Sequence, residues 1–81
     1  MEITIYGSGC ARCVRLAANA QAAADKLGLD VTITKVTDTG AIIDAGVLKT
    51  PALGLDGDVR FMGKVASAEE IERVLAEVPA A

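Results

Sequence analysis

Residues 2–13, "EITIYGSGCARC", decide the fold that we predict for this chain. The first part, residues 2–6, alternates apolar and polar side chains and is rich in β-branched residues, which is typical of a strand. Residues 7–9, Gly-Ser-Gly, interrupt that strand. From Cys10 to Leu27 the sequence is rich in alanine, leucine, arginine and glutamine, which favour a helix. Both cysteines of the chain therefore stand where a strand gives way to a helix.

Local signals in the rest of the chain predict further elements. Asp56-Gly57 is a strong signal for a tight hairpin, and Ser67 with Glu70 forms a capping box that starts a helix. The expected boundaries are a strand at 29–36, a helix from Thr37 or Asp38 to Ala45, strands at 52–55 and 59–62, and a last helix from the capping box to about Glu77. The order βαβαββα predicts an α/β domain in which helices flank a four-stranded mixed sheet.

Apolar residues at helical spacing predict which faces of the helices are buried. In the first helix this stripe consists of Leu16, Ala20, Ala23 and Leu27. In the short second helix we expect Ile42 and Ile43 to face inward.

Composition restricts the classes of function. The chain has 81 residues, of which 52% are hydrophobic, and it carries 8 Lys+Arg against 11 Asp+Glu. We expect one domain over residues 1–81. A net charge of −3 argues against nucleic-acid binding and against docking on anionic lipid. Without a long apolar run or a basic leader, the chain is expected to be cytoplasmic, where a CxxC pair is more often catalytic or metal-binding than a static crosslink.

The spacing of Cys10 and Cys13 favours thiol chemistry. Two residues three apart at a helix start lie on one side of the first turn, with Cα atoms about 5 Å apart, a separation that a disulfide accepts. The helix N-terminus favours a thiolate at Cys10, and Arg12 adds a positive charge that tunes the thiol pKa in the same direction. Cys13 lies deeper in the helix, so we expect it to be the more buried thiol and to resolve a mixed disulfide formed by Cys10.

The sequence resembles small proteins of the thioredoxin fold over essentially its whole length. Four features carry the resemblance: a strand followed by CxxC at a helix start, the order βαβαββα, Thr50-Pro51 just before the third strand, and Gly63 followed by a capped last helix. The chain is most similar to the glutaredoxin-sized, thioredoxin-like group of redox-active disulfide proteins. The nearest matches to that group are "IYGSGCARC" at 5–13 and "LKTPAL" at 48–53.

This resemblance implies a thiol–disulfide oxidoreductase that acts in electron transport without a cofactor or a metal. Cys10 would be the attacking cysteine, Cys13 the resolving one, and Pro51 a cis-proline that faces the pair. The positions expected to bind substrate are Gly9, Thr50, Pro51 and Gly63. The expected partners are a client protein with a disulfide or a low-molecular-weight thiol, and a reductant similar to thioredoxin reductase. We expect a monomer.

The chain departs from the best-known members of the family in two respects. Gly9 stands where most thioredoxins have an aromatic residue before the first cysteine. Thioredoxins also bury a carboxylate behind the cysteine pair, whereas the strand leading to Cys10 offers Thr4 and Tyr6 at the corresponding places. The first departure leaves the partner-docking surface barer, and the second removes the carboxylate that assists proton transfer. Ala11-Arg12, between the cysteines, also differs from the Gly-Pro of thioredoxins and the Pro-Tyr of glutaredoxins.

Two alternative functions use the same residues. "GSGCARC" also resembles the loop of small carriers that bind Cu(I) or Hg(II) between two thiolates, and zinc binding would need further ligands. The soft-metal carrier fold has the order βαββαβ and ends in a strand, whereas residues 67–78 predict a helix. The third possibility is an interaction module with inert thiols, for which an intact CxxC is unnecessary.

Overall fold

A computed structural model describes residues 1–7 and 11–77 of the chain. The predicted site residues Gly9 and Cys10 lie outside this described part. The elements are β1 (Glu2–Tyr6), α1 (Ala11–Leu27), β2 (Thr32–Val36), α2 (Thr39–Asp44), β3 (Ala52–Leu55), β4 (Asp58–Met62) and α3 (Ala68–Glu77). Their order is the βαβαββα order predicted from the sequence.

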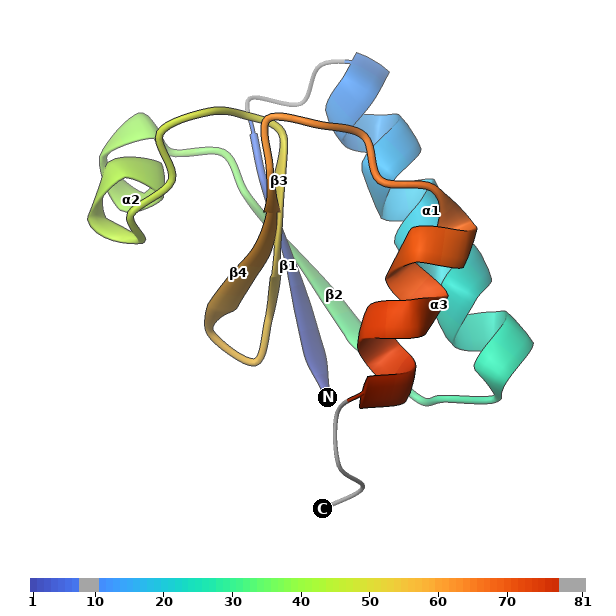
Figure 1. Ribbon diagram of the computed structural model, residues 1–81. Helices are drawn as coiled ribbons and strands as arrows, with labels where there is room; N and C mark the ends of the chain where they lie inside the picture. The colour runs from blue at the N-terminus through green and yellow to red at the C-terminus, as the bar shows by residue number, and fades with distance from the viewer. Residues whose placement is uncertain (8–10, 78–81) are drawn as a thin grey trace.

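The strands form one mixed sheet with the order β2-β1-β3-β4. β1 runs parallel to β2 and antiparallel to β3, and β4 runs antiparallel to β3. Figure 1 shows α1 and α3 side by side on one face of the sheet and α2 on the other side. The predicted fold class, a four-stranded mixed sheet flanked by helices, is therefore confirmed.

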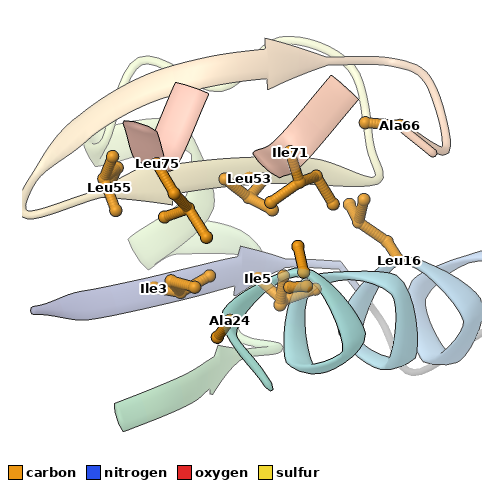
Figure 2. Packing of buried hydrophobic residues seen from close by; sticks show 11 residues of the cluster. Ile3, Ile5, Leu16, Ala24, Leu53, Leu55, Ala66, Ile71 and Leu75 are labelled. Carbon is orange, nitrogen blue, oxygen red and sulfur yellow. The ribbon is translucent and has the colours of Figure 1, made fainter. Parts of the chain in front are cut away.

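The main core lies between the sheet and the helices α1 and α3. Aliphatic side chains from β1 and β3 meet those of the two helices there (Figure 2); they are Ile3, Ile5, Leu53, Leu55, Leu16, Ile71 and Leu75. Each is at most 3% exposed, and burying one such side chain contributes about 1.5–3 kcal/mol. A smaller cluster of Tyr6, Ile42, Val47 and Ala52 fills the side of the sheet that faces α2. The two clusters hold the C-terminal end of β1 from both faces.

The start of the second strand was predicted too early, and Leu27 was wrongly placed in the core. Gly28 has a φ of +68°, its N–H donates to the Asp25 carbonyl, and the Leu29 N–H donates to the Ala24 carbonyl. These two bonds form a Schellman motif, which turns the chain back beneath the helix end. Leu29 then packs on the core while Leu27 is exposed. Residues 29–31 thus close the helix, and the strand begins at Thr32.

The prediction that both isoleucines of α2 face inward is half right. Ile42 is buried, whereas Ile43 is 60% exposed. Consecutive residues of a helix point about 100° apart, so a short helix resting on a sheet buries only one of them. Ile43 instead lines a groove of about 270 Å³ between α2 and the segment that leads to Thr50.

The predicted capping box at the start of α3 is present in the structure. The Glu70 N–H donates to Ser67 Oγ at 3.1 Å, and the Ser67 N–H donates to Glu70 Oε1 at 3.1 Å. Lys64 donates to the other carboxylate oxygen of Glu70. The hydrogen bond from Lys64, followed by that from the Ser67 backbone, lowers the pKa of Glu70 below its ordinary value of 4.5.

Ser67→Ala is expected to lower the free energy of unfolding by about 1 kcal/mol, because it removes the hydroxyl that caps α3. Urea denaturation at neutral pH measures this loss, and Ser67→Thr, which keeps a capping hydroxyl, is the matched control. The pKa of Glu70 is lower in the folded protein than its ordinary value of 4.5, so the stabilisation that ionised Glu70 gives the folded state is fully present above pH 4.5. This stabilisation is lost as the pH falls through the pKa that Glu70 has in the folded state. Equal stability of Ser67→Ala and the parent at pH 7 would contradict the capping argument.

Candidate active site

The sulfur of Cys13 packs directly against the backbone at the end of β1. Cys13 lies in the first turn of α1 and is 5% exposed. That it is the more buried of the two thiols stays a prediction, because Cys10 lies outside the described residues. A Cβ atom added to Gly7 would overlap Cys13 Sγ and would lie 4.0 Å from the Pro51 Cα. The Gly7 N–H donates to the Val36 carbonyl at 2.9 Å, which fixes this backbone beside β2. The absence of a side chain at Gly7 therefore lets Cys13 and Pro51 approach the same point.

Pro51 and Gly63 lie at the same end of the sheet as Cys13. The Thr50–Pro51 peptide bond is cis, as the resemblance implied, and Pro51 is fully buried while Thr50 is exposed. The Pro51 carbonyl accepts a hydrogen bond of 2.9 Å from the Gly63 N–H. In Figure 1 the segment before β3 and the segment after β4 both pass this end, next to the start of α1. The structure thus brings together Cys13, Pro51 and Gly63, which are far apart in the sequence.

Gly63 is placed by its own backbone conformation and by Lys49. Its φ of +73° belongs to the left-handed region that favours glycine. A Cβ at Gly63 would lie 3.0 Å from Lys49 Cβ and 3.2 Å from Lys49 Cδ. The aliphatic stem of Lys49 therefore packs across Gly63, the residue whose N–H donates to the Pro51 carbonyl.

A small pocket opens beside the Cys13 sulfur. Its volume is about 30 Å³, enough for a water molecule, and it is lined by Ile5, Gly7, Cys13, Val14, Lys35 and Thr37. Sequence reasoning missed Lys35 and Thr37 as neighbours of Cys13. The available signal was the parallel pairing of the first two strands, which places Lys35 opposite Ile5.

The described residues provide no buried carboxylate behind Cys13. Within residues 1–7 and 11–77, Thr4 is the one buried polar or charged side chain, at 8% exposure. This observation agrees with the predicted departure from thioredoxins that have a buried acid. Arg12, the position next to Cys13, is exposed on the first turn of α1, where its charge faces solvent.

A buried thiol at a helix start, packed beside a cis-proline on a βαβαββα sheet, is the arrangement of thiol–disulfide exchange proteins. Residues 1–76 match the thioredoxin domain family. The chain is 44% identical over 75 residues to a thioredoxin of Methanothermobacter thermautotrophicus, covering 93% of this chain and 97% of that protein. It is 40% identical over 73 residues to a thioredoxin of Methanocaldococcus jannaschii, covering 90% and 84% respectively. The chain therefore belongs to the thioredoxin family and is a thiol–disulfide oxidoreductase.

None of the helices in the described ranges has the length and apolar character that crossing a membrane requires.

Proposed function

We propose that Cys10 and Cys13 are the redox-active pair, with Cys10 as the attacking thiol and Cys13 as the resolving thiol. The observation that carries this assignment is the burial of Cys13 against Gly7, whose backbone also lies next to Pro51. A thiol held in that position is poorly accessible to a bulky disulfide but lies three residues from Cys10 in the sequence, close enough to form an intramolecular disulfide.

The exchange proceeds in two steps, each of which forms one sulfur–sulfur bond and breaks another. The Cys10 thiolate attacks one sulfur of a client disulfide, forming a mixed disulfide, and the other client sulfur leaves as a thiolate. The Cys13 thiolate then attacks the Cys10 sulfur, and the second client sulfur leaves. The client gains two electrons while the Cys10–Cys13 pair is oxidised to a disulfide. A dithiol reductant similar to thioredoxin reductase restores the pair.

Substrate binding in this proposal uses the surface around Pro51. An extended client segment lies beside Thr50, Pro51 and Gly63, with Gly9 leaving the approach to Cys10 open. The exposure of Thr50 and the contact between Pro51 and Gly63 support this placement. Clients are proteins with a disulfide or low-molecular-weight disulfides, and a reducing cytoplasm is the location in which a reactive CxxC pair is kept reduced.

The alternative of a soft-metal carrier has less support. That class has the element order βαββαβ, whereas here the β3–β4 hairpin is followed by the helix α3. The exchange function also agrees with membership of the thioredoxin family.

Limiting iodoacetamide at neutral pH is expected to alkylate Cys10 before Cys13 in the reduced protein, because Cys13 is buried. Mass mapping of the labelled peptides measures the order of labelling.

Arg12→Glu is expected to slow the labelling of Cys10 several-fold, since reversing one surface charge changes the electrostatic interaction with a nearby thiolate by about 1 kcal/mol. Arg73→Glu, which reverses an exposed charge on α3, is the matched control and is expected to label like the parent. Preferential labelling of Cys13 would overturn the assignment of roles.

A further inference from the structure

Four cations without ion-pair partners among the described carboxylates surround the active-site end of the molecule. Arg12 and Arg15 are exposed in the first turns of α1. Lys35 lines the pocket beside the Cys13 sulfur. Lys49 packs its stem across Gly63, whose N–H holds the Pro51 carbonyl. We call Arg12, Arg15, Lys35 and Lys49 the cationic rim.

The other basic residues leave little free positive charge elsewhere. Ion pairs join Lys26 to Glu72 at 3.8 Å, Arg60 to Glu77 at 3.3 Å, and Lys64 to Glu70. The remaining basic side chain, Arg73, lies on α3. Half of the 8 Lys and Arg residues therefore belong to the cationic rim.

Five of the 11 acidic residues lie at the end of the molecule that is far from the cationic rim. The hairpin turn between β3 and β4, the start of β1, the C-terminal end of α1 and the segment that joins α1 to β2 lie at the end of the molecule opposite the start of α1 (Figure 1). The acidic residues of these parts are Glu2, Asp25, Asp30, Asp56 and Asp58. Seventeen residues of α1 separate the two ends, a distance of about 25 Å. The acid nearest the rim in sequence is Asp38, whose carboxylate accepts the Ala41 N–H as the cap of α2. Four of the five basic side chains without an ion-pair partner among the described residues thus lie around the active site, in a chain with a net charge of −3.

We propose that the cationic rim selects client proteins whose disulfide is flanked by acidic residues. This inference rests on the proposed exchange function and names the substrate class for the same site. Charges that lie within a Debye length of a docking surface, about 8 Å at physiological salt, orient an approaching partner and raise its association rate. Complementary charge of this kind affects encounter and specificity more than final affinity. An acidic segment passing Pro51 meets Lys49 on one side and Arg12 with Lys35 on the other.

The test compares two disulfide-bridged peptides that are identical except for glutamates or lysines next to the disulfide. The dithiol form of the protein is expected to reduce the acidic peptide several-fold faster than the basic one at low salt. At about 1 M salt, where the Debye length is about 3 Å, the two rates are expected to converge. A change in the reactivity of the attacking sulfur in a variant cancels in the ratio of the two rates, because both peptides are attacked by the same sulfur.

Variants of the rim locate the effect. Lys35→Met and Lys49→Met are each expected to reduce the rate ratio at low salt, and the double variant is expected to reduce it further. Lys26→Met removes the same charge at the far end of α1 and is expected to leave the ratio unchanged. A rate ratio near one for the parent at low salt, or an equal loss in Lys26→Met, would overturn the inference. Failure of the parent to reduce either peptide would instead contradict the proposed exchange function.

Discussion

Cys13→Ser is expected to reduce turnover of a disulfide-bridged peptide to the background rate of the reductant alone. In the proposed mechanism, Cys10 of this variant still attacks the peptide, but no second thiol is present to release the product. The mixed disulfide between Cys10 and the peptide therefore accumulates. Mass spectrometry of the unreduced protein measures it as an adduct with the mass of one peptide.

Two further variants separate chemistry from folding in this experiment. Serine at a position that is 5% exposed buries a hydroxyl, which costs about 1–3 kcal/mol if it finds no hydrogen-bond partner. Cys13→Ala avoids this cost and is expected to trap the same adduct. Cys10→Ser is the matched control, and it is expected to form no adduct. Turnover by Cys13→Ser within twofold of the parent would contradict the resolving role.

Much of the fold could be predicted from the sequence because the signals are local. The hairpin turn is an example: Asp56 and Gly57 both have positive φ values, 48° and 93°, as the favoured two-residue turn requires. The capping box at Ser67 likewise depends on residues three apart. The start of β2 was misjudged because residues 29–31 alternate like a strand, while the Schellman motif at Gly28 uses them to close α1.

The candidate site could be predicted only in part. The CxxC spacing identified the cysteines, and the resemblance identified Pro51 and Gly63. The residues that share a pocket with Cys13 because of the strand register could not be predicted from a local motif. Lys35 lines the same pocket as Cys13 because β2 pairs with β1 in one particular parallel register, which places Lys35 opposite Ile5. Lys49 approaches Gly63 because the segment before β3 crosses the end of β4, a long-range contact without a local signal.

Gly7→Ala is expected to destabilise the protein by about 1–3 kcal/mol, the usual cost of forcing an extra carbon into a packed site. The backbone of Gly7 is outside the left-handed region, so alanine brings no strain of its own there. Its Cβ would overlap Cys13 Sγ and approach Cys13 Cβ to 3.4 Å. Either the sulfur must rotate away or the end of β1 must move from α1. Urea denaturation of the reduced protein measures the loss of stability.

The same substitution is expected to slow the resolving step, because both ways of relieving the overlap displace the Cys13 sulfur. The lifetime of the mixed disulfide in Gly7→Ala, followed by quenched mass spectrometry, is expected to exceed that of the parent. Gly40→Ala is the matched control: its Cβ meets only the Asp38 carboxylate at 3.2 Å, and alanine favours the helix by about 1 kcal/mol over glycine. Gly40→Ala should therefore be at least as stable as the parent and should keep the exchange rate of the parent. If Gly7→Ala matched the parent in both measurements, the backbone at Gly7 would not be what positions Cys13.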